Sequence, residues 1–244
     1  MIQADQPKIS SDRVRVSLSS VADGTMLNRT LGIGGDVVIA SRRNFCQQNE
    51  IDYSDVVYQW VSYTGGAEYD QIVEVDERSS TKYLDGVPAD ALITRTPGVG
   101  LMLPVADCVA TVVYDHKTHT LAMLHMGRHS TLTNLIERVI KRLIIDGCDA
   151  ANLQVWMSPH ATRESYKLDF FDHVDDPSWQ NYVNRRPDGI YIDMSGYNRQ
   201  KFIELGVLPD NIEVSKIDTV TSQNYYSHSA GDTTGRFAVL AYLQ

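Results

Sequence analysis

The residues of this chain best suited to chemistry are a thiol, Cys108, and an imidazole, His125. Cys108 follows an apolar segment at 100–106 and precedes a run rich in β-branched residues at 109–114, which predicts a buried strand. The polar residues 115–119 predict a turn, and 120–125 predict the returning strand. We therefore expect Cys108 and His125 to face each other near the end of a sheet.

A cysteine and a histidine placed in this way can do two kinds of chemistry. They can act as a thiolate nucleophile and its base, or as two ligands of one metal ion, and their spacing leaves both open. A cysteine in an apolar strand is commonly just a small core residue. Asp107 changes that balance, because a carboxylate inside an apolar stretch needs a partner or a function. We interpret Cys108, His125 and Asp107 as a candidate catalytic site in which Asp107 orients the pair or balances its charge.

Four motifs carry a resemblance to a known family. Residues 89–108, which end in Ala-Asp-Cys, resemble the signature of the YfiH-like family, also called the laccase-domain or polyphenol oxidoreductase family. Residues 125–132 are similar to its His-Ala-Gly-Trp-Arg-Gly-Thr-Leu element, 158–166 to its Gly-Pro turn, and 234–238 to its Thr-Gly-Arg element. The likeness extends from about Ser19 to the end of the sequence and is strongest around Cys108.

The resemblance implies a metal site, usually zinc, made by an early histidine together with the Cys of Ala-Asp-Cys and the His of His-x-Gly. Cys108 and His125 match the last two, but Ser62 stands where the early histidine is expected. Catalytic zinc normally has three protein ligands, so we expect less than one zinc per chain and predict that Ser62→His raises the zinc content. Copper is the less favoured metal. A multicopper oxidase centre needs about ten histidines, many as His-x-His pairs, and this chain has seven and no such pair.

The activity implied by the resemblance is that of a purine nucleoside phosphorylase, with associated adenosine deamination. In phosphorolysis, phosphate attacks the ribose carbon while the base departs, so the expected partners are a nucleoside and phosphate. Arg128 and His129 are candidates for binding the substrate, because they begin the strongest predicted helix and a helix N-terminus favours anions. His160, in the Gly-Pro turn, is a candidate contact for ligand or metal, and Arg236 is a candidate for a structural or anion-pairing role.

Other functions stay open at this point. One is a metal-free Cys–His hydrolase or deamidase, because the family fold is similar to the catalytic domain of cytotoxic necrotizing factor toxins. Another is the copper-dependent phenol oxidase of the family name. The third is a non-catalytic paralogue that binds a nucleoside or a peptidoglycan precursor. Product analysis and elemental analysis of the purified protein would separate these classes.

Composition narrows the class of protein. The chain has 244 residues with 43% hydrophobic content and no linker or repeat, so we expect a single domain over residues 1–244. Its three cysteines have no paired spacing, which argues against a disulfide framework. Without a signal-like N-terminus or a long apolar run, the sequence predicts a cytoplasmic protein outside the membrane. A formal charge of −9 disfavours nucleic acid as a partner. The oligomeric state stays open.

The order of predicted elements favours an α+β fold, a layered domain with a mixed β-sheet packed by helices. The expected helices cover residues 36–49, with Asp36 as the N-cap, 131–144 and 195–205. The expected strands cover residues 13–18, 56–61, 71–75, 109–114, 120–125, 153–157, 212–215 and 237–243.

Overall fold

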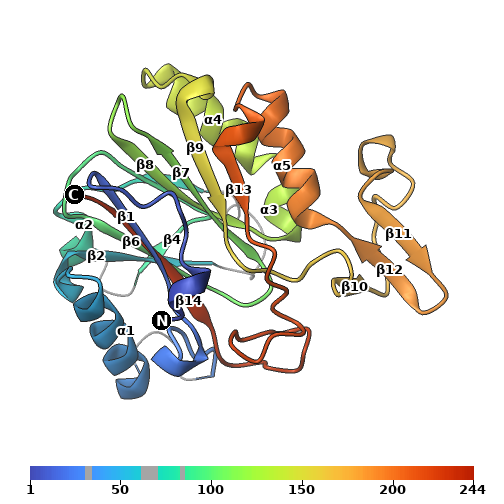
Figure 1. Cartoon of the computed structure of the whole chain (residues 1–244), viewed down its shortest axis with the longest axis horizontal. Coiled ribbons are helices and arrows are strands. Elements are labelled where there is room, and N and C mark those ends of the chain that lie inside the picture. The colour runs from blue at the N-terminus through green and yellow to red at the C-terminus, as the bar shows by residue number, and fades with distance from the viewer. Residues whose placement is uncertain (31–34, 62–70, 83–85) are drawn as a thin grey trace.

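The computed structural model describes residues 1–30, 35–61, 71–82 and 86–244 (Figure 1). The described strands form three sheets, of five, three and six strands, and the helices lie outside the two larger ones. The α+β fold predicted from the sequence is confirmed, but the expected single mixed sheet is replaced by two large sheets packed face to face and a small third one. The division into domains stays a prediction.

The first large sheet has the strand order β1-β14-β6-β2-β4. Its strands are β1 (Val14–Leu18), β14 (Phe237–Leu243), β6 (Gly100–Val105), β2 (Val56–Trp60) and β4 (Val87–Pro88). Helix α1 (Asp36–Gln48) covers the outer face, where Phe45 and Cys46 pack against residues of β6 and β14. Gly35 is the N-cap of this helix, so the expectation that Asp36 is the cap was wrong. Asp36 lies in the first turn, where its negative charge interacts favourably with the helix dipole.

The second large sheet has the strand order β13-β9-β7-β8-β5-β3. Its strands are β13 (Ile212–Val214), β9 (Leu153–Met157), β7 (Val109–Asp115), β8 (Thr120–Met126), β5 (Ala91–Thr94) and β3 (Ile72–Glu74). Helices α3 (Arg128–Leu132), α4 (Leu135–Ile145) and α5 (Met194–Glu204) lie over one face of it (Figure 1). The single helix predicted over residues 131–144 is thus two helices, because Asn134 takes a left-handed conformation with φ 59°.

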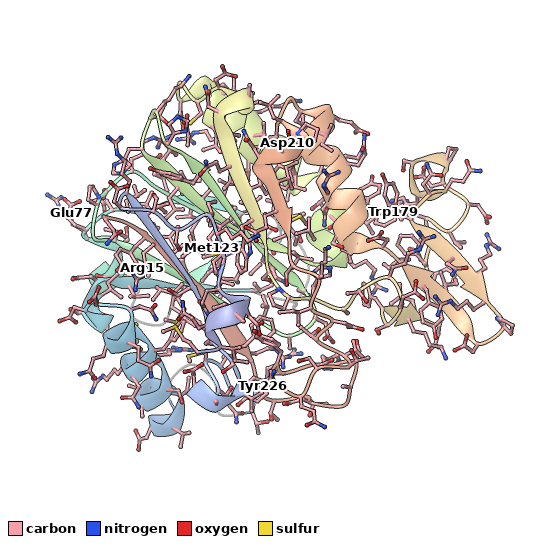
Figure 2. The ribbon with its side chains drawn as sticks, in the orientation of Figure 1. Arg15, Glu77, Met123, Trp179, Asp210 and Tyr226 are labelled. Carbon is pink, nitrogen blue, oxygen red and sulfur yellow. The ribbon has the colours of Figure 1, made fainter. Side chains whose placement is uncertain are left out.

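The main core lies between the two large sheets. Along β8, Leu121 and Met123 pack toward the first sheet, while Ala122 and Leu124 pack toward the helices. Figure 2 labels Met123 within the main body of the molecule. Because side chains of a strand alternate between its two faces, His125 takes the same face as Leu121 and Met123. The histidine therefore points into the space between the two sheets.

The third sheet is a small one that was not predicted from the sequence. It contains β10 (Lys167–Leu168), β12 (Gly189–Ile192) and β11 (Val183–Arg186), and it lies to the side of the main body beyond α5 (Figure 1). Trp179, labelled in Figure 2, stacks on Tyr197 of α5 with 3.8 Å between ring centroids and joins this part to the body. The remaining helices are α2 (Ser79–Lys82) and the 3-10 helices Gln3–Asp5, Val21–Asp23, Tyr53–Asp55, Ala150–Asn152, Pro177–Trp179 and Pro209–Asn211.

A helix needs about 20 mostly apolar residues to span a membrane. Within the described part of the chain, every helix is too short or too polar to cross a bilayer.

Candidate active site

Cys108 lies where the chain crosses from one large sheet to the other. Strand β6 of the first sheet ends at Val105, and β7 of the second begins at Val109. Asp107, between them, has φ 74°, a left-handed conformation that Asp tolerates better than most residues. This turn places the half-buried Cys108 at the edge of the space between the sheets.

His125 and Cys108 come together over Gly127. A β-carbon added to Gly127 would lie 3.2 Å from Cys108 Sγ, 3.0 Å from His125 Cε1 and 3.4 Å from His125 Nε2. The thiol and the imidazole therefore converge on the same point above the backbone of Gly127. A β-carbon at position 127 would therefore crowd both groups, so glycine leaves them room to approach each other.

Asp90 fixes the orientation of the imidazole. Ala91 of β5 is paired with Leu124 of β8, so Asp90 falls beside His125. Its Oδ1 accepts a hydrogen bond from His125 Nδ1 at 2.8 Å, and its backbone oxygen accepts one from the His125 N–H at 2.7 Å. Both side chains are at most 5% exposed. With Nδ1 held by Asp90, Nε2 remains for Cys108, which is the arrangement of a nucleophile, a base and an orienting acid.

The charge state of His125 follows from these neighbours. Burial by itself lowers the pKa of His125, but the electrostatic interaction with Cys108 and the hydrogen bond to Asp90 outweigh it and raise the pKa from 6.5 to about 9. The imidazole therefore holds its proton more tightly than a free histidine does. Such a group can donate that proton to a leaving group.

Asp107 has a different role from the one expected for it. Its Oδ1 accepts a hydrogen bond from Thr219 Oγ1 at 2.7 Å, and its Oδ2 accepts one from the backbone N–H of Ser229 at 2.6 Å. The carboxylate therefore ties two loops to the crossing, and Asp90 orients the histidine. Asp90 was missed in the sequence, although it carried the same signal as Asp107, a charge beside an apolar strand.

A cavity of about 500 Å³ opens beside these residues, which is a typical size for a small-molecule site. We use "floor" for Cys108, His125 and the supporting Asp90, and "rim" for the exposed residues Arg29, Trp60 and His228. The cavity is lined by Leu27, Arg29, Tyr58, Gln59, Trp60, Val61, Pro104, Val105, Ala106, Asp107, Cys108, His125, Tyr166, His228, Ser229 and Arg236.

Of the predicted substrate-binding residues, the structure brings Arg236 to the cavity but not the two on α3. Arg236 is 8% exposed and lies in the wall just before β14. Arg128 and His129 are exposed on a helix of five residues and are absent from the lining. The Gly127 N–H at the start of that helix donates to Ser130 Oγ at 2.9 Å. The geometry therefore does not support the anion site that was expected at this helix.

His160 is a structural residue in the described part of the chain. It is 2% exposed, and its Nδ1 donates a hydrogen bond to the backbone oxygen of Ser158 at 2.7 Å. Its backbone forms a bridge with Asp218, next to the Thr219 that binds Asp107. The expectation that His160 touches ligand or metal is replaced by a role in holding this loop.

The described residues do not complete a zinc site. Cys108 Sγ and His125 Nε2 converge as two ligands would, and the bond from His125 Nδ1 to Asp90 is typical of metal-binding histidines. A third donor is required, and the described residues contain no group of three or more His, Cys, Asp or Glu side chains suited to a metal. Ser62 lies outside the described residues. Because two donors do not fit zinc, the chemistry is derived below from the side chains themselves.

Comparison with protein families agrees with this geometry. The model of the multi-copper polyphenol oxidoreductase laccase family matches residues 20–244. The chain therefore belongs to this family, and the resemblance seen in its motifs is confirmed.

Named relatives come from several bacteria. A purine nucleoside phosphorylase of Xylella fastidiosa is 24% identical over 227 residues, covering 91% of this chain and 85% of the relative. A purine nucleoside phosphorylase of Mycobacterium tuberculosis is 24% identical, covering 76% of this chain and 72% of the relative. An adenosine deaminase RL5 from an unknown prokaryotic organism is 24% identical and covers 85% and 81%.

Solved structures with the same fold support the arrangement of the sheets. The Bacillus licheniformis hypothetical protein YfiH has a TM-score of 0.79 at 22% identity, covering 95% of this chain and 93% of its own. YlmD from Geobacillus stearothermophilus has a TM-score of 0.80 at 20% identity, covering 95% and 92%. At these identities the likeness establishes the fold and nothing more.

Proposed function

We propose that this protein is a purine nucleoside phosphorylase-like enzyme, which cleaves inosine or adenosine with phosphate. The observation that carries the proposal is the floor of the cavity, where Cys108, His125 and Asp90 meet beside the cationic side chain of Arg236. Relatives named as purine nucleoside phosphorylases support this choice of substrate. Nucleoside and phosphate are thus the proposed partners.

The reaction requires an acid for the departing base. An oxygen of phosphate forms a bond to C1′ of the ribose, and the bond from C1′ to the purine nitrogen breaks with its electron pair going to the purine. His125 Nε2 gives its proton to the purine, and the interaction with Cys108 and the hydrogen bond to Asp90 favour the protonated imidazole before this transfer. Solvent returns the proton to His125.

Phosphate requires cations inside the cavity. Arg236 and the rim residue Arg29 supply guanidinium groups, which suit phosphate because they offer parallel N–H donors. His228 of the rim adds a third nitrogen-bearing side chain. This assignment moves the phosphate site from α3 to the cavity wall near Arg236, just before the start of β14.

Product analysis tests the proposal directly. Inosine and adenosine are incubated with the protein, with and without phosphate and with and without added zinc, and the products are separated by chromatography. We expect free base and ribose 1-phosphate, formed faster with phosphate, and no product with Cys108→Ala. If the rate of base release does not depend on phosphate, the protein is a hydrolase. If adenosine is converted to inosine, it is a deaminase. The proposal is wrong if neither nucleoside is consumed under any of these conditions.

A further inference from the structure

Among the described residues that line the cavity, one exposed tryptophan is not used by the proposed chemistry. Trp60, at the end of β2, is 39% exposed and lines the cavity together with the floor residues. Most large apolar side chains of the described chain are buried, so a tryptophan on a cavity wall needs an explanation.

The backbone around Trp60 is well fixed although its side chain is exposed. Trp60 is paired with Pro88 of β4, and its backbone oxygen accepts a hydrogen bond from the Ala89 N–H at 3.1 Å. Its neighbour Gln59 is fully buried and donates from Nε2 to the backbone oxygen of Ala89 at 3.1 Å. The indole is therefore held on a rigid strand end, which preorganises a binding surface.

The other aromatic rings of the cavity are less available to a ligand. Tyr58 is 7% exposed, and the guanidinium of Arg42 lies 3.7 Å from the centroid of its ring. Tyr166 is half-buried on the side of Cys108, where the sulfur, Asp107 and Arg128 act on it electrostatically. Of the tyrosine and tryptophan side chains described in the cavity lining, Trp60 is the most exposed.

We infer that Trp60 is the specificity-determining residue for the base, a platform on which the planar purine stacks while His125 faces its leaving nitrogen. This inference rests on the proposed function. Both residues line one cavity of about 500 Å³, so a nucleoside that fills it touches both walls. Indole offers the largest aromatic face, and the two fused rings of a purine overlap it more than the single ring of a pyrimidine. Trp60 therefore favours purines over pyrimidines.

Tryptophan fluorescence can report this contact without any turnover. The chain has three tryptophans, and the other two, Trp156 and Trp179, are 2% and 1% exposed. Titration with hypoxanthine or inosine in the absence of phosphate should quench the emission and protect it from acrylamide. Uridine should do so only at higher concentration.

Variants at position 60 give the decisive comparison, with affinity measured by equilibrium dialysis of radiolabelled hypoxanthine. Trp60→Ala should weaken binding roughly 5- to 150-fold, the range for loss of one base-stacking contact, and should reduce the preference for inosine over uridine. Trp60→Phe should retain most of the affinity because a ring remains. Phe170→Ala, which removes an aromatic residue 71% exposed outside the cavity, is the matched control and should bind as the unmodified protein does.

The outcomes for Trp60 and for the phosphorylase reaction can be told apart. If Trp60→Ala binds hypoxanthine as tightly as the unmodified protein, the inference about Trp60 is wrong even when phosphorolysis is observed. If purines bind through Trp60 but no nucleoside is ever cleaved, the stacking platform stands and the proposed reaction is wrong. Circular dichroism of each variant confirms that the fold is intact.

Discussion

The floor and the rim of the cavity are built in different ways. The floor residues Cys108, His125 and Asp90 come from the starts or ends of neighbouring strands, β7, β8 and β5, and a buried hydrogen bond joins His125 to Asp90. The rim residues Arg29, Trp60 and His228 come from separate parts of the chain and are exposed. The difference indicates that the reacting groups are held rigidly, while recognition of the substrate can change by substitution without disturbing them.

The largest expected effect is at the floor. His125→Ala removes the proton donor, so kcat for inosine phosphorolysis should fall roughly 10²- to 10⁴-fold, the usual contribution of general acid catalysis. His116→Ala, in the exposed turn after β7, is a matched control and should leave kcat unchanged. If kcat falls only a few fold in His125→Ala, the floor residues do not carry out the reaction.

The next effect separates the two acidic residues. Asp90→Asn should lower kcat by roughly 10- to 100-fold, because the imidazole loses the carboxylate that orients it. Asp107→Asn should affect KM more than kcat, because the Asp107 carboxylate binds Thr219 and the backbone of Ser229 instead. Steady-state kinetics on both variants measure this split. A greater loss of kcat in Asp107→Asn would contradict the role given to Asp90.

A smaller effect distinguishes the cations of the cavity from those of α3. Arg236→Gln should raise the KM for phosphate by about tenfold, since a hydrogen bond to a charged group contributes roughly 1.5–3 kcal/mol. Arg128→Ala should raise it less, because Arg128 does not line the cavity. Phosphate is varied at saturating inosine in each assay. If Arg128→Ala raises the KM for phosphate more than Arg236→Gln does, phosphate binds near α3 and not in the cavity.

The smallest effect concerns stability away from both floor and rim. Burial lowers the pKa of His160 from 6.5 in the folded chain. Below pH 6.5 the unfolded chain binds a proton that the folded one does not, so the free energy of unfolding is highest above pH 6.5 and falls as the pH decreases. His160→Asn should flatten this dependence, as measured by denaturant unfolding at several pH values. If the free energy of unfolding changes equally with pH in His160→Asn and in the unmodified protein, His160 does not cause the pH dependence.

The floor was the more predictable region. Cys108 and His125 are linked by two strands and a short turn, so local pattern indicated that they would be near each other. Asp90 was missed because its position beside His125 depends on β5 being the next strand after β8, and strand order is not encoded locally. The rim was missed for the same reason, since β2, the loop after β1 and the loop before β14 meet only through sheet topology.

Two further differences have local physical causes. The predicted helix over residues 131–144 is interrupted because Asn134 adopts a left-handed conformation, which the apolar spacing on either side does not reveal. The small sheet escaped prediction because β10, β11 and β12 have two to four residues each and are stabilised by an aromatic cluster with Phe171, Trp179 and Tyr197. The zinc content and the effect of Ser62→His stay predictions.

The position of β14 also bears on how the protein is made. Its residues pair with β1 on one side and β6 on the other, so this strand lies between two that are made before it. On the ribosome, β1 has no described neighbour to pair with until residues 237–243 have left the exit tunnel. Arg236, one residue ahead of this strand, reaches the cavity at the same late moment. The nascent chain therefore exposes an unpaired apolar edge until β14 is made, and chaperones that bind such edges are expected to act on it before the cavity exists.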